Sequence, residues 1–215
     1  MIDLHVHSVL SDGELIPSEI IRRLSELENG GVAITDHADF ATIPHIMSCL
    51  RRMQDVRDDY EIPVLFGIEI THVPPKLIGR AVELALAEGA EIIVVHGETL
   101  VEPVAEGTNL AAVNEEVDIL AHPGVLDEAA AELAAENGIH VEITTRRGHS
   151  LTNGLVAKLS YEYGYRLVIN TDAHSPGDFV TKSFAEKVLR GAGVENIGDV
   201  FGNSQKLLEK KLKRK

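Results

Sequence analysis

Short strand-like runs alternate with helix-like runs along the whole 215-residue chain, and this alternation constrains the fold more than any other feature. Nearly continuous apolar runs such as 92–95 (IIVV) are typical of strands that helices cover on both faces of a parallel sheet. Strands are expected at 2–6, 32–35, 63–68, 91–95, 117–121, 140–143 and 166–170. Helices are expected at 17–28, 44–58, 76–88, 110–115, 125–137, 151–163, 179–190 and 197–212. The pattern predicts one α/β domain over residues 1–215, either an open doubly wound sheet or a barrel.

Composition narrows the class of protein. The formal net charge of −14 disfavours a broad nucleic-acid-binding surface, because such a surface needs clustered basic residues. The basic tail, Lys206 and residues 210–215 beyond it, is expected to be a solvated helix end. We find neither the ~18-residue apolar run of a membrane helix nor a signal peptide. With one cysteine, Cys49, the sequence favours a cytoplasmic protein without membrane association.

Metal-ligating residue types gather where the predicted strands end. Every predicted strand except the sixth has a histidine or a carboxylate there: His5, His7, Asp36, His37, Glu69, His96, His122, Asp172 and His174. Asp12, in the loop after the first strand, is close enough in sequence to join them. In a β/α barrel these strand ends converge on one face, where barrel active sites lie. A single histidine at a strand end is usually a surface residue, but so many together predict a metal site.

Histidine and carboxylate without cysteine suit zinc, manganese or iron. The number of candidate ligands exceeds the needs of one ion, so two or three divalent ions are expected in one cleft, with Glu69 as a bridging carboxylate. The remaining histidines are interpreted as background residues: His45, His72, His140 and His149. Of these, His72 and His149 are expected on the same side of the barrel as the cleft.

The order of the motifs resembles the PHP (polymerase and histidinol phosphatase) family of metal-dependent phosphoesterases. The motifs are HVHS with SDG, then TDH, GIE, VHG, AHPG and TDAHS, between His5 and Pro176. The resemblance implies a distorted, TIM-like (β/α)7 barrel that holds three ions. It implies one ion bound by His5, His7, Glu69 and Asp172, a second by Glu69, His96 and His122, and a third by Asp12, His37 and His174. Some members have a histidine where Asp12 stands, so the third site is expected to differ in affinity or metal preference.

Clustered divalent ions neutralise phosphate charge and lower the pKa of a bound water from roughly 16 toward about 7. We therefore expect hydroxide activated in this way to attack a phosphoester. The candidate catalytic residues are the third ligand set together with two arginines after the sixth strand: Asp12, His37, His174, Arg146 and Arg147. A guanidinium fork matches a phosphate, so one arginine is expected to hold the substrate. Asp36 is expected either to orient an imidazole or to cap its strand.

The favoured function is hydrolysis of a small phosphomonoester, such as histidinol phosphate or a nucleotide. A nuclease or phosphodiesterase acting on nucleic-acid ends is the alternative; the net charge disfavours it and the basic tail keeps it open. A non-catalytic scaffold on the same barrel is a third possibility. Such a protein is expected to have lost ligands, and this sequence lacks none of them.

Overall fold

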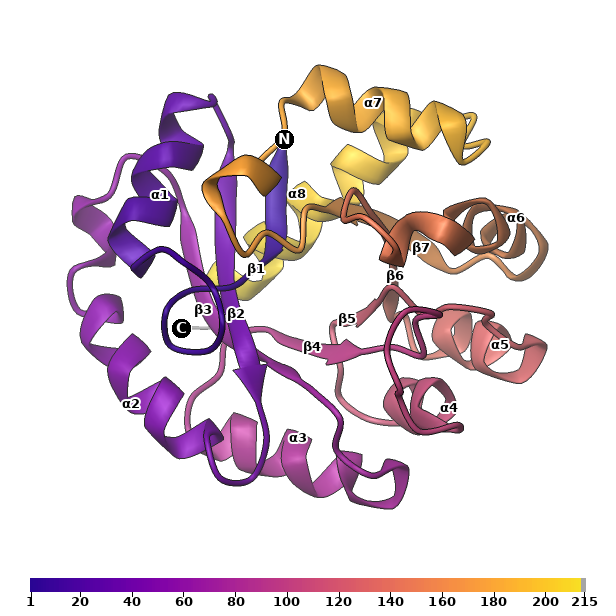
Figure 1. The fold of residues 1–215 in the computed structure, drawn as a ribbon, viewed down its shortest axis with the longest axis horizontal. Coiled ribbons are helices and arrows are strands. Elements are labelled where there is room, and N and C mark those ends of the chain that lie inside the picture. Colours follow the sequence, from indigo (N-terminus) through magenta and orange to yellow (C-terminus); the bar gives the residue numbers. More distant parts are fainter. Residues whose placement is uncertain (214–215) are drawn as a thin grey trace.

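A computed structural model describes residues 1–213, and in these residues the strands form one parallel sheet in chain order (Figure 1). The strands are β1 (Ile2–Val6), β2 (Gly31–Ala38), β3 (Val64–Ile70), β4 (Ile93–His96), β5 (Ile119–Ala121), β6 (His140–Thr144) and β7 (Arg166–Asn170). The helices are α1 (Pro17–Glu26), α2 (Ile43–Gln54), α3 (Ile78–Ala87), α4 (Thr108–Val113), α5 (Glu128–Glu136), α6 (Asn153–Tyr163), α7 (Lys182–Gly191) and α8 (Ile197–Leu212). The helices α1 to α6 surround the curved sheet, which confirms the distorted (β/α)7 barrel.

The barrel is nearly closed between its first strand and the segment that follows its last. Val6 forms a parallel bridge with Ala173, and the backbone N–H of His7 donates to the carbonyl of Ala173 at 2.9 Å. Side chains complete the seam, since Asn170 accepts from the backbone N–H of Leu4 at 2.9 Å. Asp3 accepts from the hydroxyl and the backbone N–H of Thr171, and burial raises the pKa of this carboxyl to about 6 despite these bonds.

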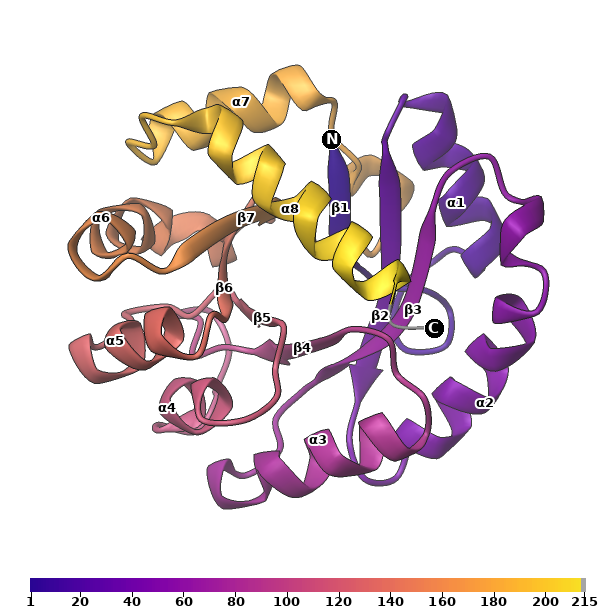
Figure 2. The ribbon, with the colours of Figure 1, turned by 180° about the vertical axis from the view of Figure 1, so that it is seen from behind.

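Helix α8 covers the end of the barrel at which the strands begin. Figure 2 shows it lying across β7, β1 and β3, the strands that it contacts. Leu207 and Leu208 are buried among apolar side chains from six strands: Leu4, Ala33, Leu65, Val94, Ile119 and Val168. Among residues 1–213, no helix has both the length and the apolar character that crossing a membrane requires. The apolar contacts of α8 therefore close the barrel interior at the end where the strands begin.

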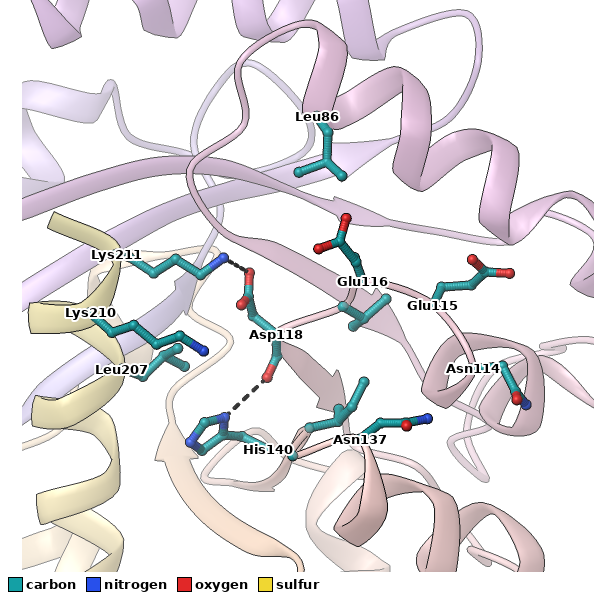
Figure 3. A pocket seen from close by; sticks show the side chains of 13 residues that line it. Leu86, Asn114, Glu115, Glu116, Asp118, Asn137, His140, Leu207, Lys210 and Lys211 are labelled. Carbon is teal, nitrogen blue, oxygen red and sulfur yellow. Dashed lines mark hydrogen bonds and ion pairs between the residues drawn. The ribbon is translucent and has the colours of Figure 1, made fainter. Parts of the chain in front are cut away.

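The basic tail was predicted to be a solvated helix end, and the structure confirms this for only part of it. Lys206 and Lys210 are exposed, but the side chain of Lys211 is 8% exposed and its Nζ lies 2.6 Å from Oδ2 of Asp118 (Figure 3). The Lys211 side chain is largely covered because Leu207 and Leu208 of α8 pack with Ile119 at the start of β5. Residues 214–215 lie outside the described residues. The nearby pocket, about 460 Å³ in volume, lies at the end of the barrel away from the expected ligands.

Several element bounds differ from the prediction for local reasons. Strands β2 and β3 run further than expected, so His37 and Glu69 lie within strands and not after them. Helix α5 begins at Glu128 because the side chain of Asp127 accepts from the backbone N–H of Ala130 and caps it. Helix α6 begins at Asn153 because a 3-10 turn precedes it. These shifts leave every strand end on the predicted face.

Candidate metal centre

The expected ligands meet at the C-terminal end of the strands, around a cleft of about 320 Å³. Most of them are buried, namely His5, His7, Glu69, His96, His122 and Asp172. His37 and His174 are half-buried, while the Asp12 side chain is 60% exposed. The ligand set therefore extends from the barrel interior to solvent, with the residues expected around the third ion at the outer edge.

One group consists of the two histidines of β1 with the carboxylate that follows β7. Ligand atoms of His5, His7 and Asp172 lie within 4.8 Å of one another. Nε2 of His7 lies 3.1 Å from Oδ1 of Asp172, and Nε2 of His5 lies 3.3 Å from Oε1 of Glu69. The barrel seam creates this group, because the same closure that pairs β1 with the segment after β7 brings the three residues together.

Glu69 lies at the centre of the cluster. Its Oε1 lies 3.3 Å from Nε2 of His5 and 3.6 Å from Nε2 of His122, and its Oε2 lies 2.6 Å from Nδ1 of His37. Ligand atoms of His5, Glu69 and His122 form a second group within 4.8 Å. His96, which the family resemblance places with Glu69 and His122, lies outside that group. A carboxylate with imidazoles on both oxygens is suited to bridge two ions.

The outermost group joins the loop after β1 to β2 and to the segment after β7. It consists of His7, Asp12, His37 and His174, and so adds His7 to the set that the resemblance implies. Oδ1 of Asp12 lies 3.3 Å from Nε2 of His174, whose hydrogen bond lowers the pKa of Asp12 to about 2. Asp12 is therefore ionised, as a metal ligand must be.

Asp36 holds the loop that carries Asp12. Its carboxylate accepts from the backbone N–H and the hydroxyl of both Ser8 and Ser11, at 2.7 to 3.2 Å. These four hydrogen bonds account for a fully buried carboxylate without any imidazole partner among the described residues. The expectation that Asp36 orients an imidazole or caps its strand is wrong, because the loop after β1 takes up both of its oxygens.

The buried atoms fit divalent cations. Among the described residues, no hydrogen-bond partner exists for Oε1 of Glu69, Oδ1 of Asp172, Nδ1 of His7 or Nδ1 of His122. Burial, with Glu69 and Glu142 nearby, raises the pKa of Asp172 to about 7. Burial alone would lower the pKa of His5, but the carboxylates of Glu69, Glu142 and Asp172 hold it well above its usual value. Buried carboxylates crowded in this way need positive charge beside them, and bound cations supply it.

A family model for the PHP domain matches residues 3–190. The chain belongs to the PHP domain family. As a PHP protein it is a metal-dependent phosphoesterase. A relative in Methanocaldococcus jannaschii, the uncharacterized protein MJ1295, is 50% identical over 197 residues, which cover 90% of each chain.

Two solved structures share the fold of this PHP domain. A chain in the cryo-EM structure of archaeal ribonuclease P with mature tRNA has a TM-score of 0.73 and 18% identity, over 97% of this chain and 90% of that one. A histidinol phosphate phosphatase from Lactococcus lactis, complexed with zinc, L-histidinol and phosphate, has a TM-score of 0.60 and 15% identity. That alignment covers 89% of this chain and 93% of the phosphatase. At these identities the likeness concerns the fold.

Glu142 gives the PHP site a carboxylate from β6, the strand from which no ligand was predicted. Its Oε2 accepts from Nδ1 of His5 and from Nδ2 of Asn170, both at 2.8 Å. A metal-bound histidine usually donates its other N–H to such an oxygen, which fixes the ring and its tautomer. Glu142 thus directs Nε2 of His5 toward the cleft. The signal in the sequence is a glutamate between the apolar residues Val141 and Ile143 of the strand HVEIT.

Two histidines interpreted as background also line the cleft of this PHP domain, and that interpretation is wrong. The ring centroids of His149 and His122 lie 4.3 Å apart, and those of His72 and His96 lie 5.3 Å apart. Glu102, which the sequence analysis missed, approaches both of them and His96. His72 and Glu102 lie in loops and His149 begins the 3-10 turn before α6, so no strand period indicates which way they face.

The two candidate arginines lie differently in the PHP domain. Arg146 lines the cleft; its Nη1 donates to the carbonyl of Asp172 at 2.9 Å, and its Nε lies 3.5 Å from Oδ2 of the same residue. Arg147 is exposed and lines a neighbouring pocket of about 710 Å³, which Arg146 and His174 also line. Arg146 is therefore the arginine placed beside the metal-ligand candidates.

Proposed function

We propose that this PHP domain hydrolyses a small phosphomonoester with two or three divalent ions, of zinc, manganese or iron, held in its cleft. The observation that carries the proposal is the set of three linked ligand groups on one cleft. His5 belongs to two of these groups, and so does His7, which links all three. Glu69 contacts members of each group. When bound, such ions neutralise phosphate charge and lower the pKa of the attacking water.

The protein's own residues would position the substrate. Arg146 uses Nε and Nη1 toward Asp172, which holds its guanidinium at the cleft beside His174. The rest of this planar group can donate to a phosphate oxygen. His174 contacts the carbonyl of Asp172 through Nδ1 and Asp12 through Nε2, so we assign it to ligation and not to general acid catalysis.

The size and charge of the protein favour a small substrate. A cleft of about 320 Å³ is at the lower end of the range for small-molecule sites. The net charge of −14 would repel a nucleic-acid backbone. Histidinol phosphate and nucleotide monophosphates are the substrates that we propose to test first.

The test is phosphate release by chelator-treated protein reloaded separately with manganese and zinc. We expect turnover of an aryl monophosphate that is lost on stripping and returns on reloading, followed by selective turnover of one metabolite in a screen. Faster cleavage of an aryl diester or a short oligonucleotide would replace this proposal with the nuclease alternative. A protein that holds its ions and hydrolyses no phosphoester would overturn it, and a protein that binds no ion would support the scaffold.

A further inference from the structure

Glu102, on the loop between β4 and α4, brings a carboxylate to the cleft that no expected ligand set includes. Its Oε2 lies 3.1 Å from Nε2 of His96 and 3.4 Å from Nε2 of His72, and its Oε1 lies 3.4 Å from Nε2 of His149. These histidines come from the end of β4 and from the segments after β3 and β6. Three separate segments therefore direct imidazole nitrogens at one loop carboxylate.

The separation between Oε2 of Glu102 and Nε2 of His96, 3.1 Å, is close to the distance between two ligands of one ion. Atoms bound tetrahedrally to zinc at about 2.0–2.1 Å lie roughly 3.4 Å from each other. The expected ligand pairs His7–Asp172 and His174–Asp12 lie at 3.1 and 3.3 Å. Glu102 and His96, at 3.1 Å, belong to the same range.

His96 has its nearest acidic partner in Glu102. Nδ1 of His96 contacts the carbonyl of Gly97 at 3.1 Å, which leaves Nε2 for an ion, and Nε2 is the atom that faces Glu102. Within residues 1–213, Glu69 makes no ion-pair contact with His96, although it makes one with His122. The rings of His96 and His122 nevertheless lie 4.5 Å apart. An ion held by Nε2 of His96 would therefore have the Glu102 carboxylate within reach.

His149 and His72 are arranged to hold the Glu102 carboxylate. Nδ1 of His149 pairs with the hydroxyl of Thr99 at 2.7 Å, which directs Nε2 of that ring toward Glu102. His72 has φ of 53°, in the left-handed region that non-glycine residues rarely adopt. His122 (φ 25°) and Asp172 (φ 53°) share this feature at the metal centre, whereas Glu28 (φ 57°), the fourth such residue among those described, follows α1.

We propose that Glu102 is a carboxylate ligand of the ion bound by His96 and His122, and that His72 and His149 hold it in place. The inference rests on the metal centre proposed above and adds to it a second carboxylate for this ion, besides Glu69. Because Glu102 is 38% exposed and lies in a loop, this ion would have one ligand that can move without disturbing the barrel.

The test compares Glu102→Gln with Glu106→Gln, an exposed residue of the same loop. Metal-free proteins are titrated with Zn²⁺ and with Mn²⁺ against a chelating dye, and bound metal is counted by mass spectrometry after dialysis. We expect one ion to bind at least tenfold more weakly in Glu102→Gln, and the other ions to keep wild-type affinity. Glu106→Gln should match the wild type throughout.

A second readout separates ligation from a packing effect. Cobalt-loaded Glu102→Gln should show a changed visible absorption spectrum, since the ligand field of one ion changes, and circular dichroism should show an intact fold. Wild-type affinity for every ion together with an unchanged cobalt spectrum, in both Glu102→Gln and Glu102→Ala, would overturn this inference alone. A wild-type protein that binds no ion would instead overturn the metal centre itself.

Discussion

Replacement of Glu142 by glutamine tests whether the oxygen behind His5 sets metal affinity. Glu142 is fully buried, and only its Oε2 is bonded, since Oε1 has no partner among the described residues. Glutamine can therefore place its carbonyl where Oε2 lies and keep both hydrogen bonds, to His5 and Asn170. The substitution removes the charge and leaves an amide NH₂ where Oε1 was, so it changes electrostatics with little change in shape.

The size of the effect follows from the hydrogen bond between Glu142 and His5, which is 2.8 Å long. A hydrogen bond to a charged group contributes about 1.5–3 kcal/mol, and a neutral one about 1 kcal/mol. The difference, about 0.5–2 kcal/mol, corresponds to a roughly 2- to 30-fold loss of affinity for the ion at His5. This range overlaps the roughly 10- to 100-fold that loss of an outer partner usually costs.

The assay is competition with a chelator at pH 8, where protons compete less for His5. Glu132→Gln, on the exposed face of α5, is the matched control and should bind every ion as the wild type does. A folded Glu142→Gln protein with undiminished affinity would refute the reasoning, because it would show that the charge on Glu142 does not act through His5.

Three further predictions concern stability and substrate binding. Leu208→Ala should destabilise the protein by about 2–5 kcal/mol in urea unfolding, because it leaves a cavity where α8 closes the barrel; a loss below about 1 kcal/mol would contradict this role. Arg146→Ala should raise KM or lower kcat/KM for the phosphoester while metal content stays full, and Arg147→Ala should do so less; equal kinetics in both variants and the wild type would exclude a phosphate contact. Burial lowers the pKa of His140 to about 4, from a usual value near 6.5, so this side chain contributes stability above about pH 6.5 that is lost as the pH falls toward 4. Denaturant unfolding of metal-free His140→Gln should lose up to about 3 kcal/mol of that pH dependence, and a curve parallel to the wild type would contradict the assignment.

The strands could be predicted closely from the sequence. β1 and β7 have the predicted bounds, because each is a short apolar run that polar residues end. Their order along the chain then determines which side chains share the C-terminal face, since consecutive parallel strands of a barrel lie side by side. For this reason His5, Glu69 and Asp172 could be placed together without any knowledge of distances.

The residues that surround the ligands were harder to predict. Glu142 lies within β6, and nothing in the sequence indicates that its carboxylate reaches His5, 137 residues earlier in the chain. Glu102 lies in a loop and His149 in a 3-10 turn, and the positions of both segments depend on tertiary contacts such as the one between His149 and Thr99. The charge of Lys211 predicts an exposed side chain, but the packing of α8 places this side chain beside Asp118.

The seam between β1 and the segment after β7 has a consequence for how the protein is made. The bond between Leu4 and Asn170 spans 166 residues, so one edge of the first strand stays unpaired until nearly the whole chain has been synthesised. Contacts this distant in sequence form slowly. Because His5 and Asp172 meet only where the seam closes, an ion held by both would stabilise the closed seam, so metal binding and seam closure would be thermodynamically linked. Without that ion the seam would open more readily and expose the edge of the first strand, to which another chain can pair.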